Sequence, residues 1–225
     1  MFAIIGENFP AFHLLPRRIR AVVSLVANII DEMNVVPNLE LEKGWRFIDV
    51  GAHVGAYSAL ARRLVGRNGI VVAVEPDPDN FRELLVNMRL VGRNGIPVRA
   101  AICNRNGSRL FYRYYAGSLG SLLPGNSPKA PIIVNCLTLD RLYEILKKRR
   151  LIDRVDAVKV DVEGAEEEVL RGAPHVLEMS RFILVEVHDS NKLKPLAAIL
   201  ARSGFQVRAI GSHRHILGIK HKLAN

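Results

Sequence analysis

The feature that most restricts the fold is an alternation of short apolar runs with amphipathic segments from Trp45 onward. Apolar, β-branched runs occur at residues 45–50, 70–74, 96–102, 155–160 and 182–187, and segments with helical spacing occur at 54–65 and 80–91. Continuous apolar runs of this length are typical of parallel strands that are buried on both faces. The alternation therefore predicts an α/β fold, with a mostly parallel sheet covered by helices on both faces.

Three regions depart from this alternation. Between the third and fourth strands we expect a strand at 109–115, a Gly/Ser/Pro-rich loop at 116–130, a strand at 131–137 and a helix at 138–149. At the C-terminal end, a helix at 193–203 precedes a hairpin-like pair of strands at 205–210 and 214–219. The first 43 residues lie outside the alternation and are expected to form a helical arm, which leaves residues 44–225 as the main domain.

A glycine-containing turn, Asp49-Val50-Gly51-Ala52-His53-Val54-Gly55, lies between the first strand and the first helix. Open α/β sheets bind nucleotides at this point. His53 and Ala56 stand where a dinucleotide fingerprint has its second and third glycines. The turn therefore favours a ligand that carries no phosphate there. A tight strand-to-helix turn without a ligand is the structural alternative.

Glu75 strengthens the ligand-binding interpretation. It ends the second strand and follows Gly55 by 20 residues. An acidic residue at about this spacing accepts hydrogen bonds from ribose hydroxyls in nucleotide-binding α/β folds. The turn and Glu75 together predict an adenosine-type ligand at the carboxyl ends of the strands.

Four segments together resemble the FkbM family of S-adenosylmethionine (SAM)-dependent methyltransferases. They are Phe47–Gly55, Val74-Glu75-Pro76, Lys159-Val-Asp-Val-Glu-Gly-Ala-Glu166 and Val185-Glu186-Val187-His188. The resemblance implies a Rossmann-like class I methyltransferase fold with SAM as cofactor. Its seven strands would follow the order 3-2-1-4-5-7-6, with strand seven antiparallel. Most members of the family are described as O-methyltransferases.

The resemblance also implies a set of cofactor-binding residues. Asp49, Gly51 and Gly55 would line the methionine and ribose end of SAM, His53 would approach its carboxylate, and Glu75 would hold the ribose. Ala101 and Ile102, at the end of strand three, would flank the adenine, and Asp161 would also contact the cofactor.

Three polar side chains follow strands four and five and are candidates for catalysis. Methyl transfer to a hydroxyl requires removal of a proton, for which Asp161, Glu163 and His188 are candidates. In the alternative interpretation, Asp161 or Glu163 caps the next helix and His188 is an ordinary loop residue. Residues 166–168 (Glu-Glu-Glu) are expected to complement the dipole of that helix. No metal site is predicted, since spacing alone does not show that these side chains would hold a divalent ion.

The charge of the chain leaves two acceptor classes open. The formal net charge is +10, from 32 Lys and Arg against 22 Asp and Glu. Residues 190–225 contain seven Lys or Arg and no Asp or Glu, and 147–150 add a second basic cluster. The leading hypothesis is a small-molecule or glycan O-methyltransferase. The alternative is a tRNA or rRNA methyltransferase whose basic surface holds phosphates.

The remaining expectations concern location and assembly. The N-terminus is a poor signal peptide, and the most apolar stretch, 21–30, is too short to span a bilayer. Cys103 and Cys136 are the only cysteines, so no disulfide framework is expected, and a cytoplasmic location follows. A monomer and a homodimer are both compatible with the sequence.

Overall fold

The computed structural model describes residues 41–225, except for 93, 114–119, 124–129, 211–214 and 221–225. The predicted arm at 1–43 therefore lies almost wholly outside the described residues, as do residues 116–119 and 124–129 of the predicted Gly/Ser/Pro-rich loop. No helix in the described part of the chain is long and apolar enough to cross a membrane.

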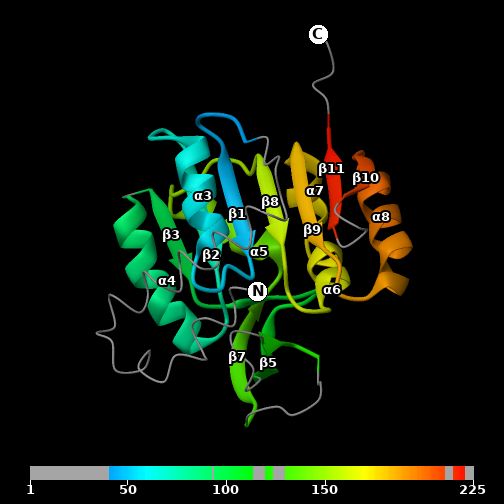
Figure 1. Cartoon of the computed structure of the whole chain (residues 1–225), viewed down its shortest axis with the longest axis horizontal. Coiled ribbons are helices and arrows are strands. Elements are labelled where there is room, and N and C mark those ends of the chain that lie inside the picture. Colours follow the sequence, from blue (N-terminus) through cyan, green and yellow to red (C-terminus); the bar gives the residue numbers. More distant parts are fainter. Residues whose placement is uncertain (1–40, 93, 114–119, 124–129, 211–214, 221–225) are drawn as a thin grey trace.

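A seven-stranded sheet forms the centre of the molecule (Figure 1). Its strands are β1 (Arg46–Val50), β2 (Ile70–Val74), β3 (Gly95–Val98), β8 (Ala157–Val160), β9 (Phe182–Glu186), β10 (Gln206–Ile210) and β11 (His215–Ile219), in the order β10-β11-β9-β8-β1-β2-β3. β11 runs antiparallel to both of its neighbours, and the other paired strands are parallel. The predicted strand order and the antiparallel seventh strand are confirmed.

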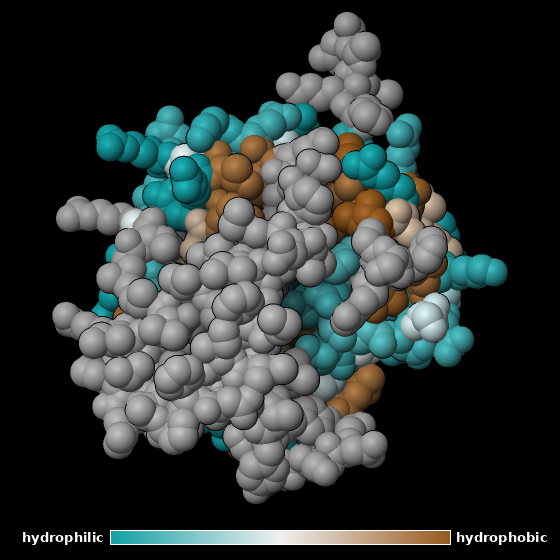
Figure 2. All heavy atoms as spheres, viewed as in Figure 1, coloured by the Kyte–Doolittle hydropathy of each residue, from teal (hydrophilic) through white to brown (hydrophobic). Residues whose placement is uncertain are grey.

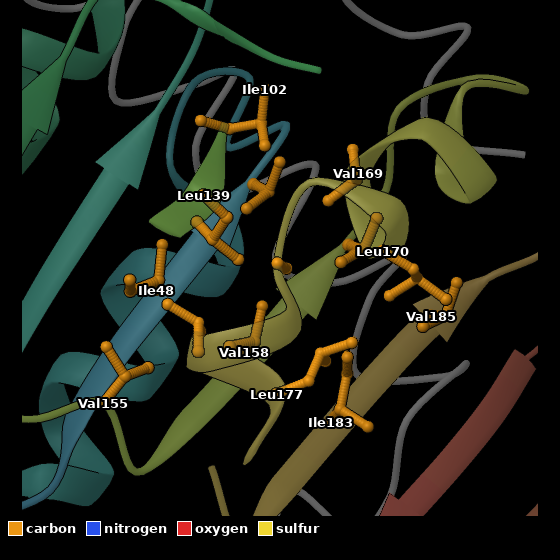
Figure 3. Packing of buried hydrophobic residues seen from close by; sticks show 14 of the residues in the cluster. Ile48, Ile102, Leu139, Val155, Val158, Val169, Leu170, Leu177, Ile183 and Val185 are labelled. Carbon is orange, nitrogen blue, oxygen red and sulfur yellow. The ribbon is translucent and has the colours of Figure 1, made fainter. Parts of the chain in front are cut away.

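Helices cover both faces of this sheet, as predicted (Figure 1). They are α3 (Ala56–Val65) and α4 (Pro78–Val91) on one face, and α5 (Leu139–Lys148), α6 (Glu166–Arg171), α7 (Pro174–Met179) and α8 (Leu193–Arg202) on the other; a short 3-10 helix, η2 (Ser190–Lys192), precedes α8. Alternate residues of each strand supply the two cores. In β1, for example, Phe47 packs with α3 and α4, whereas Ile48 packs with the opposite helices (Figure 3).

The insertion forms a second, four-stranded sheet that extends from one end of the first (Figure 1). It contains β4 (Ala101–Ile102), β5 (Gly107–Arg113), β6 (Gly120–Ser121) and β7 (Ile132–Leu137), in the order β4-β7-β5-β6. The predicted third strand at 96–102 is therefore wrong in its second half. β3 is an edge strand that contains Pro97, and it ends at Val98; Ala101 and Ile102 take their backbone partners from β7 instead.

The two cysteines are bonded to each other, which corrects the expectation that no disulfide holds the fold. Cys103 and Cys136 have Cα atoms 5.8 Å apart and join the ends of β4 and β7. They are 33 residues apart in the sequence, and only the parallel pairing of these two strands brings them together. The disulfide lies in a small buried cluster between the two sheets.

Candidate active site

The glycine turn packs directly against the loop that follows β8. Gly51 has a φ of 80°, and a Cβ atom there would lie 1.7 Å from the backbone oxygen of Asp161. Gly55 has a φ of 94°, and a Cβ atom would lie 2.7 Å from Leu84 Cδ1. Both positions need glycine for conformation and for space. The structure therefore explains both glycines of the motif, and the closeness of Gly51 to Asp161 places the predicted cofactor and catalytic segments side by side.

Glu75 is buried at the carboxyl end of β2. Its Oε2 accepts a hydrogen bond from the backbone N–H of His53 at 2.9 Å, and its Oε1 accepts one from that of Asp77 at 2.9 Å. Burial raises the pKa of Glu75 to about 7 although both hydrogen bonds act in the opposite direction. A carboxylate offers about four acceptor positions, so Glu75 retains acceptor capacity among the described residues that suits a ribose hydroxyl.

His53 lies in the same turn, with a φ of 52° that is uncommon for a residue with a side chain. Burial lowers its pKa to about 4, against the opposing effect of Asp161. His53 is therefore neutral near pH 7. It would approach a ligand carboxylate as a hydrogen-bonding group without a charge.

A buried cation, Lys159, separates two carboxylates beneath the turn. Asp49 and Lys159 are register partners in β1 and β8, with Asp49 Oδ1 3.7 Å and Asp161 Oδ2 3.0 Å from Lys159 Nζ. The ammonium group also lies 4.1 Å from the centre of the Tyr57 ring. Asp49 accepts a hydrogen bond from Ser58 Oγ at 2.7 Å, and burial raises its pKa against the effect of Lys159. The sequence analysis assigned no role to Lys159, although a lysine inside an apolar strand is a signal for a buried ion pair.

The three predicted catalytic side chains meet in one cluster around His188. Its Nε2 lies 3.2 Å from Glu163 Oε2, 3.7 Å from Asp161 Oδ1 and 3.8 Å from Glu186 Oε1. Its Nδ1 lies 2.8 Å from Oε1 of Glu166. Burial alone would lower the pKa of His188, but the hydrogen bond to Glu166 and the other carboxylates outweigh it and raise the pKa to about 9.

Glu166 has a role beyond the expected one. It stands in the first turn of α6, but it is fully buried and accepts a hydrogen bond from the backbone N–H of Gly164 at 2.7 Å. The sequence analysis missed both Glu166 and Glu186 as members of the cluster. Their only signal was their place within the two motifs that also contain Asp161 and His188.

Neither Asp161 nor Glu163 caps α6, so the capping alternative is wrong. The helix begins after Ala165 without a side-chain cap. Glu163 instead adopts a φ of 51°, a strained conformation that is common at functional sites. Burial raises the pKa of Glu163 against the effect of His188. Ser121, in the described end of the predicted Gly/Ser loop, donates a hydrogen bond to the backbone oxygen of Glu163 at 2.7 Å.

The predicted adenine-flanking residues lie in β4 and not at the end of strand three. Ala101 and Ile102 are 4% and 2% exposed, and their side chains pack in the protein core. Their contact with a ligand stays a prediction.

A cavity of about 270 Å³, lined mostly by residues with polar side chains, opens next to Gly164 and Ala165, in the loop that carries Glu163. Its other lining residues are Asn104, Leu123, Glu167, Glu168, Arg171 and Lys192. Figure 2 shows hydrophilic surface at the position that α6 occupies in Figure 1. Charged and amide groups of this kind suit a hydroxylated molecule better than an apolar one.

The strand order, the glycine turn and the acidic residue after β2 define a class I methyltransferase domain. Two solved structures share the fold. A methyltransferase FkbM from Methylobacillus flagellatus matches with a TM-score of 0.59 and 16% identity, over 97% of this chain and 60% of that one. Fibrillarin from Aeropyrum pernix, crystallised with natively bound SAM, matches with a TM-score of 0.51 and 16% identity, over 84% and 72% of the two chains.

Residues 49–207 match the model of the methyltransferase FkbM domain, and the chain belongs to this family of SAM-dependent methyltransferases. The hexuronic acid methyltransferase AglP of Haloferax volcanii is 27% identical over 69% of this chain and 61% of that protein. Methyltransferase sdnD of Sordaria araneosa is 29% identical over 71% and 73% of the two chains. The chain therefore spans about three fifths of the length of the archaeal relative. SAM is the cofactor of the domain.

Proposed function

We propose that this protein transfers the methyl group of SAM to a hydroxyl of a small molecule or glycan. The observation that carries the proposal is the cluster of Asp161, Glu163 and His188 at the carboxyl ends of β8 and β9, beside the glycine turn. The relative named as a hexuronic acid methyltransferase supports a sugar-like acceptor. The cavity next to Gly164 and Ala165 agrees with such an acceptor.

The chain's own residues suggest how SAM is held. Glu75 would accept hydrogen bonds from the ribose hydroxyls, and the backbone of the turn between Gly51 and Gly55 would pass close to the methionine moiety. Asp49 and Asp161 would place negative charge near the sulfonium. Asp161 is held in place by Lys159 at 3.0 Å, so its orientation does not depend on the cofactor.

In this proposal Glu163 receives the proton of the acceptor hydroxyl. The acceptor oxygen forms a bond to the methyl carbon, the bond between carbon and sulfur breaks, and its electron pair remains on sulfur. Both carboxylates have a cationic neighbour, Lys159 for Asp161 and His188 for Glu163. Glu163 is favoured because burial raises its pKa and because its side chain is 31% exposed, against 20% for Asp161. Positioning of the two substrates provides most of the rate enhancement, and the base adds to it.

The test uses methyl-labelled SAM with uronic-acid-containing oligosaccharides, neutral oligosaccharides and tRNA as separate acceptors. We expect label in an oligosaccharide as an alkali-stable ether, with a rate at least a hundredfold lower in Glu163→Gln. Glu144→Gln, which changes an exposed carboxylate on α5 paired with Arg141, is the matched control and should retain the rate.

Two outcomes would contradict this proposal. Alkali-labile label that Glu163→Gln does not reduce would show a carboxylate acceptor, which needs no base. Label in tRNA would favour the RNA alternative. That alternative is weakened because Lys192 and Lys220, two of the basic residues invoked for it, donate hydrogen bonds to backbone oxygens of Gly164 and Leu177.

A further inference from the structure

We propose that the His188 cluster is a binding site for one divalent metal ion, with Asp161 Oδ1, Glu186 Oε1 and His188 Nε2 as ligands. One ligand atom from each of these three residues lies within 4.8 Å of the others. The inference goes beyond the methyl transfer proposed above, and binding at this site does not depend on which acceptor is methylated.

The distances within the cluster match a shared ion better than direct hydrogen bonds. His188 Nε2 lies 3.7 Å from Asp161 Oδ1 and 3.8 Å from Glu186 Oε1, and both separations are too long for hydrogen bonds. Two ligands that each lie about 2.1 Å from one ion are roughly 3.0–3.5 Å apart in octahedral or tetrahedral geometry. Small side-chain rotations would close the remaining difference.

The second nitrogen of His188 is already oriented as in a metal site. Its Nδ1 lies 2.8 Å from the fully buried carboxylate of Glu166, which is itself held by the backbone N–H of Gly164. A metal-binding histidine almost always donates its other ring N–H to a carboxylate or carbonyl group, which fixes its tautomer. Glu166 therefore orients Nε2 of His188 towards Glu163, Asp161 and Glu186, and a metal ion that binds there would displace the proton on Nε2.

An independent observation comes from His215 on the neighbouring strand β11. The residue is 2% exposed, and neither of its ring nitrogens has a hydrogen-bond partner among the described residues. Its Nε2 lies 3.7 Å from Glu186 Oε2, so this buried imidazole faces the carboxylate that would bind the ion. The ion pair between His215 and Oε2 of Glu186 leaves the other oxygen of this carboxylate, Oε1, facing His188. His215 therefore orients Glu186 towards the position of the ion.

The charge and accessibility of the cluster fit the same conclusion. Four carboxylates, those of Asp161, Glu163, Glu166 and Glu186, lie within 4 Å of His188. The side chains of Asp161, Glu186 and His188 are 18–20% exposed, so an ion has access to them. Mixed imidazole and carboxylate ligands favour ions such as Mn²⁺ or Zn²⁺ over Mg²⁺ and Ca²⁺. A divalent ion there would bind the acceptor oxygen and lower the pKa of its hydroxyl, with the proton still passing to Glu163.

The experiment titrates the full chain, freed of metal by dialysis against a chelator, with Mn²⁺ and follows free Mn²⁺ by electron paramagnetic resonance; Zn²⁺ competition is the second probe. We expect one saturable site per chain that is lost in His188→Ala and in Asp161→Asn. His175→Ala, which changes an exposed histidine on α7, should bind Mn²⁺ as the wild type does. Glu166→Gln should weaken binding by about ten- to a hundredfold, because it removes only the orienting partner.

Absence of saturable binding by either ion would overturn the inference, as would unchanged binding in His188→Ala. If His188→Ala fails to fold, judged by circular dichroism, Glu186→Gln takes its place in the same titration. The two proposals fail separately. Mn²⁺ binding without methyl transfer to any acceptor would refute only the proposed function, and methyl transfer by a protein that binds no ion would refute only the metal site.

Discussion

Protonation of Glu75 is expected to control the affinity of the protein for its cofactor. The ionised carboxylate accepts hydrogen bonds from ribose hydroxyls, whereas the protonated form must first release its proton. With a pKa of about 7, Glu75 is mostly ionised at pH 8 and mostly protonated at pH 6. The apparent dissociation constant should therefore rise about tenfold between pH 8 and pH 6, or about 1.4 kcal/mol.

Isothermal titration calorimetry with S-adenosylhomocysteine at pH 6, 7 and 8 measures this change. Binding near pH 6 should release a proton, which is detected by repeating the titration in buffers of different ionisation enthalpy. His53 does not titrate in this range, because burial lowers its pKa to about 4. Glu75→Gln is the control: it removes the titrating carboxylate of Glu75, so any pH dependence that remains comes from the ligand. A dissociation constant that does not change with pH, or the same slope in Glu75→Gln, would refute the reasoning.

Two further predictions concern stability, and one concerns cofactor binding. Lys159→Met should lower the free energy of unfolding by about 3–5 kcal/mol, because it leaves Asp161 and Asp49 without their buried cation. Thermal denaturation measures this loss, with Lys148→Met, at an exposed lysine, as the control. Equal melting temperatures for Lys159→Met and the wild type would contradict the prediction. Gly51→Ala should abolish cofactor binding in a calorimetric titration, since the new Cβ would lie 1.7 Å from Asp161 O; binding at wild-type affinity would show that the turn moves freely. Reduction of the disulfide between Cys103 and Cys136 should lower the free energy of unfolding by about 3–4 kcal/mol, because the unfolded chain is then no longer restricted by the cross-link. Urea denaturation with and without dithiothreitol measures this loss. An unchanged unfolding midpoint on adding dithiothreitol would disprove that contribution.

Local patterns in the sequence were sufficient to predict the main sheet. The strands of the main sheet and the helices α3, α4, α5 and α8 were recognisable from the spacing of their own apolar residues, although β3 is shorter than predicted. The spacing of Glu75 from Gly55 follows from a helix, a turn and a strand of ordinary length. The motifs after β8 and β9 also pointed to Asp161, Glu163 and His188. The structure brings these side chains together, because the carboxyl ends of adjacent parallel strands lie at one edge of the sheet.

Contacts between distant segments were not predictable in this way. Pro97 gave a signal that β3 was an edge strand, but nothing local showed that Ala101 and Ile102 would pair with β7 and bring Cys103 to Cys136. Their partners are decided by which backbone groups remain unpaired once the first sheet has formed.

The same distinction applies to the site. Residue type and position in the motifs were enough to identify the candidates for proton transfer. This identification did not require knowing which side chains surround each candidate in space. Only the tertiary structure showed that Glu166 turns inward to hold His188, and that His215 comes from β11 to face Glu186. The physical reason is that orientation, burial and charge balance depend on every group packed around a side chain, and these groups come from strands and helices that are far apart in the sequence.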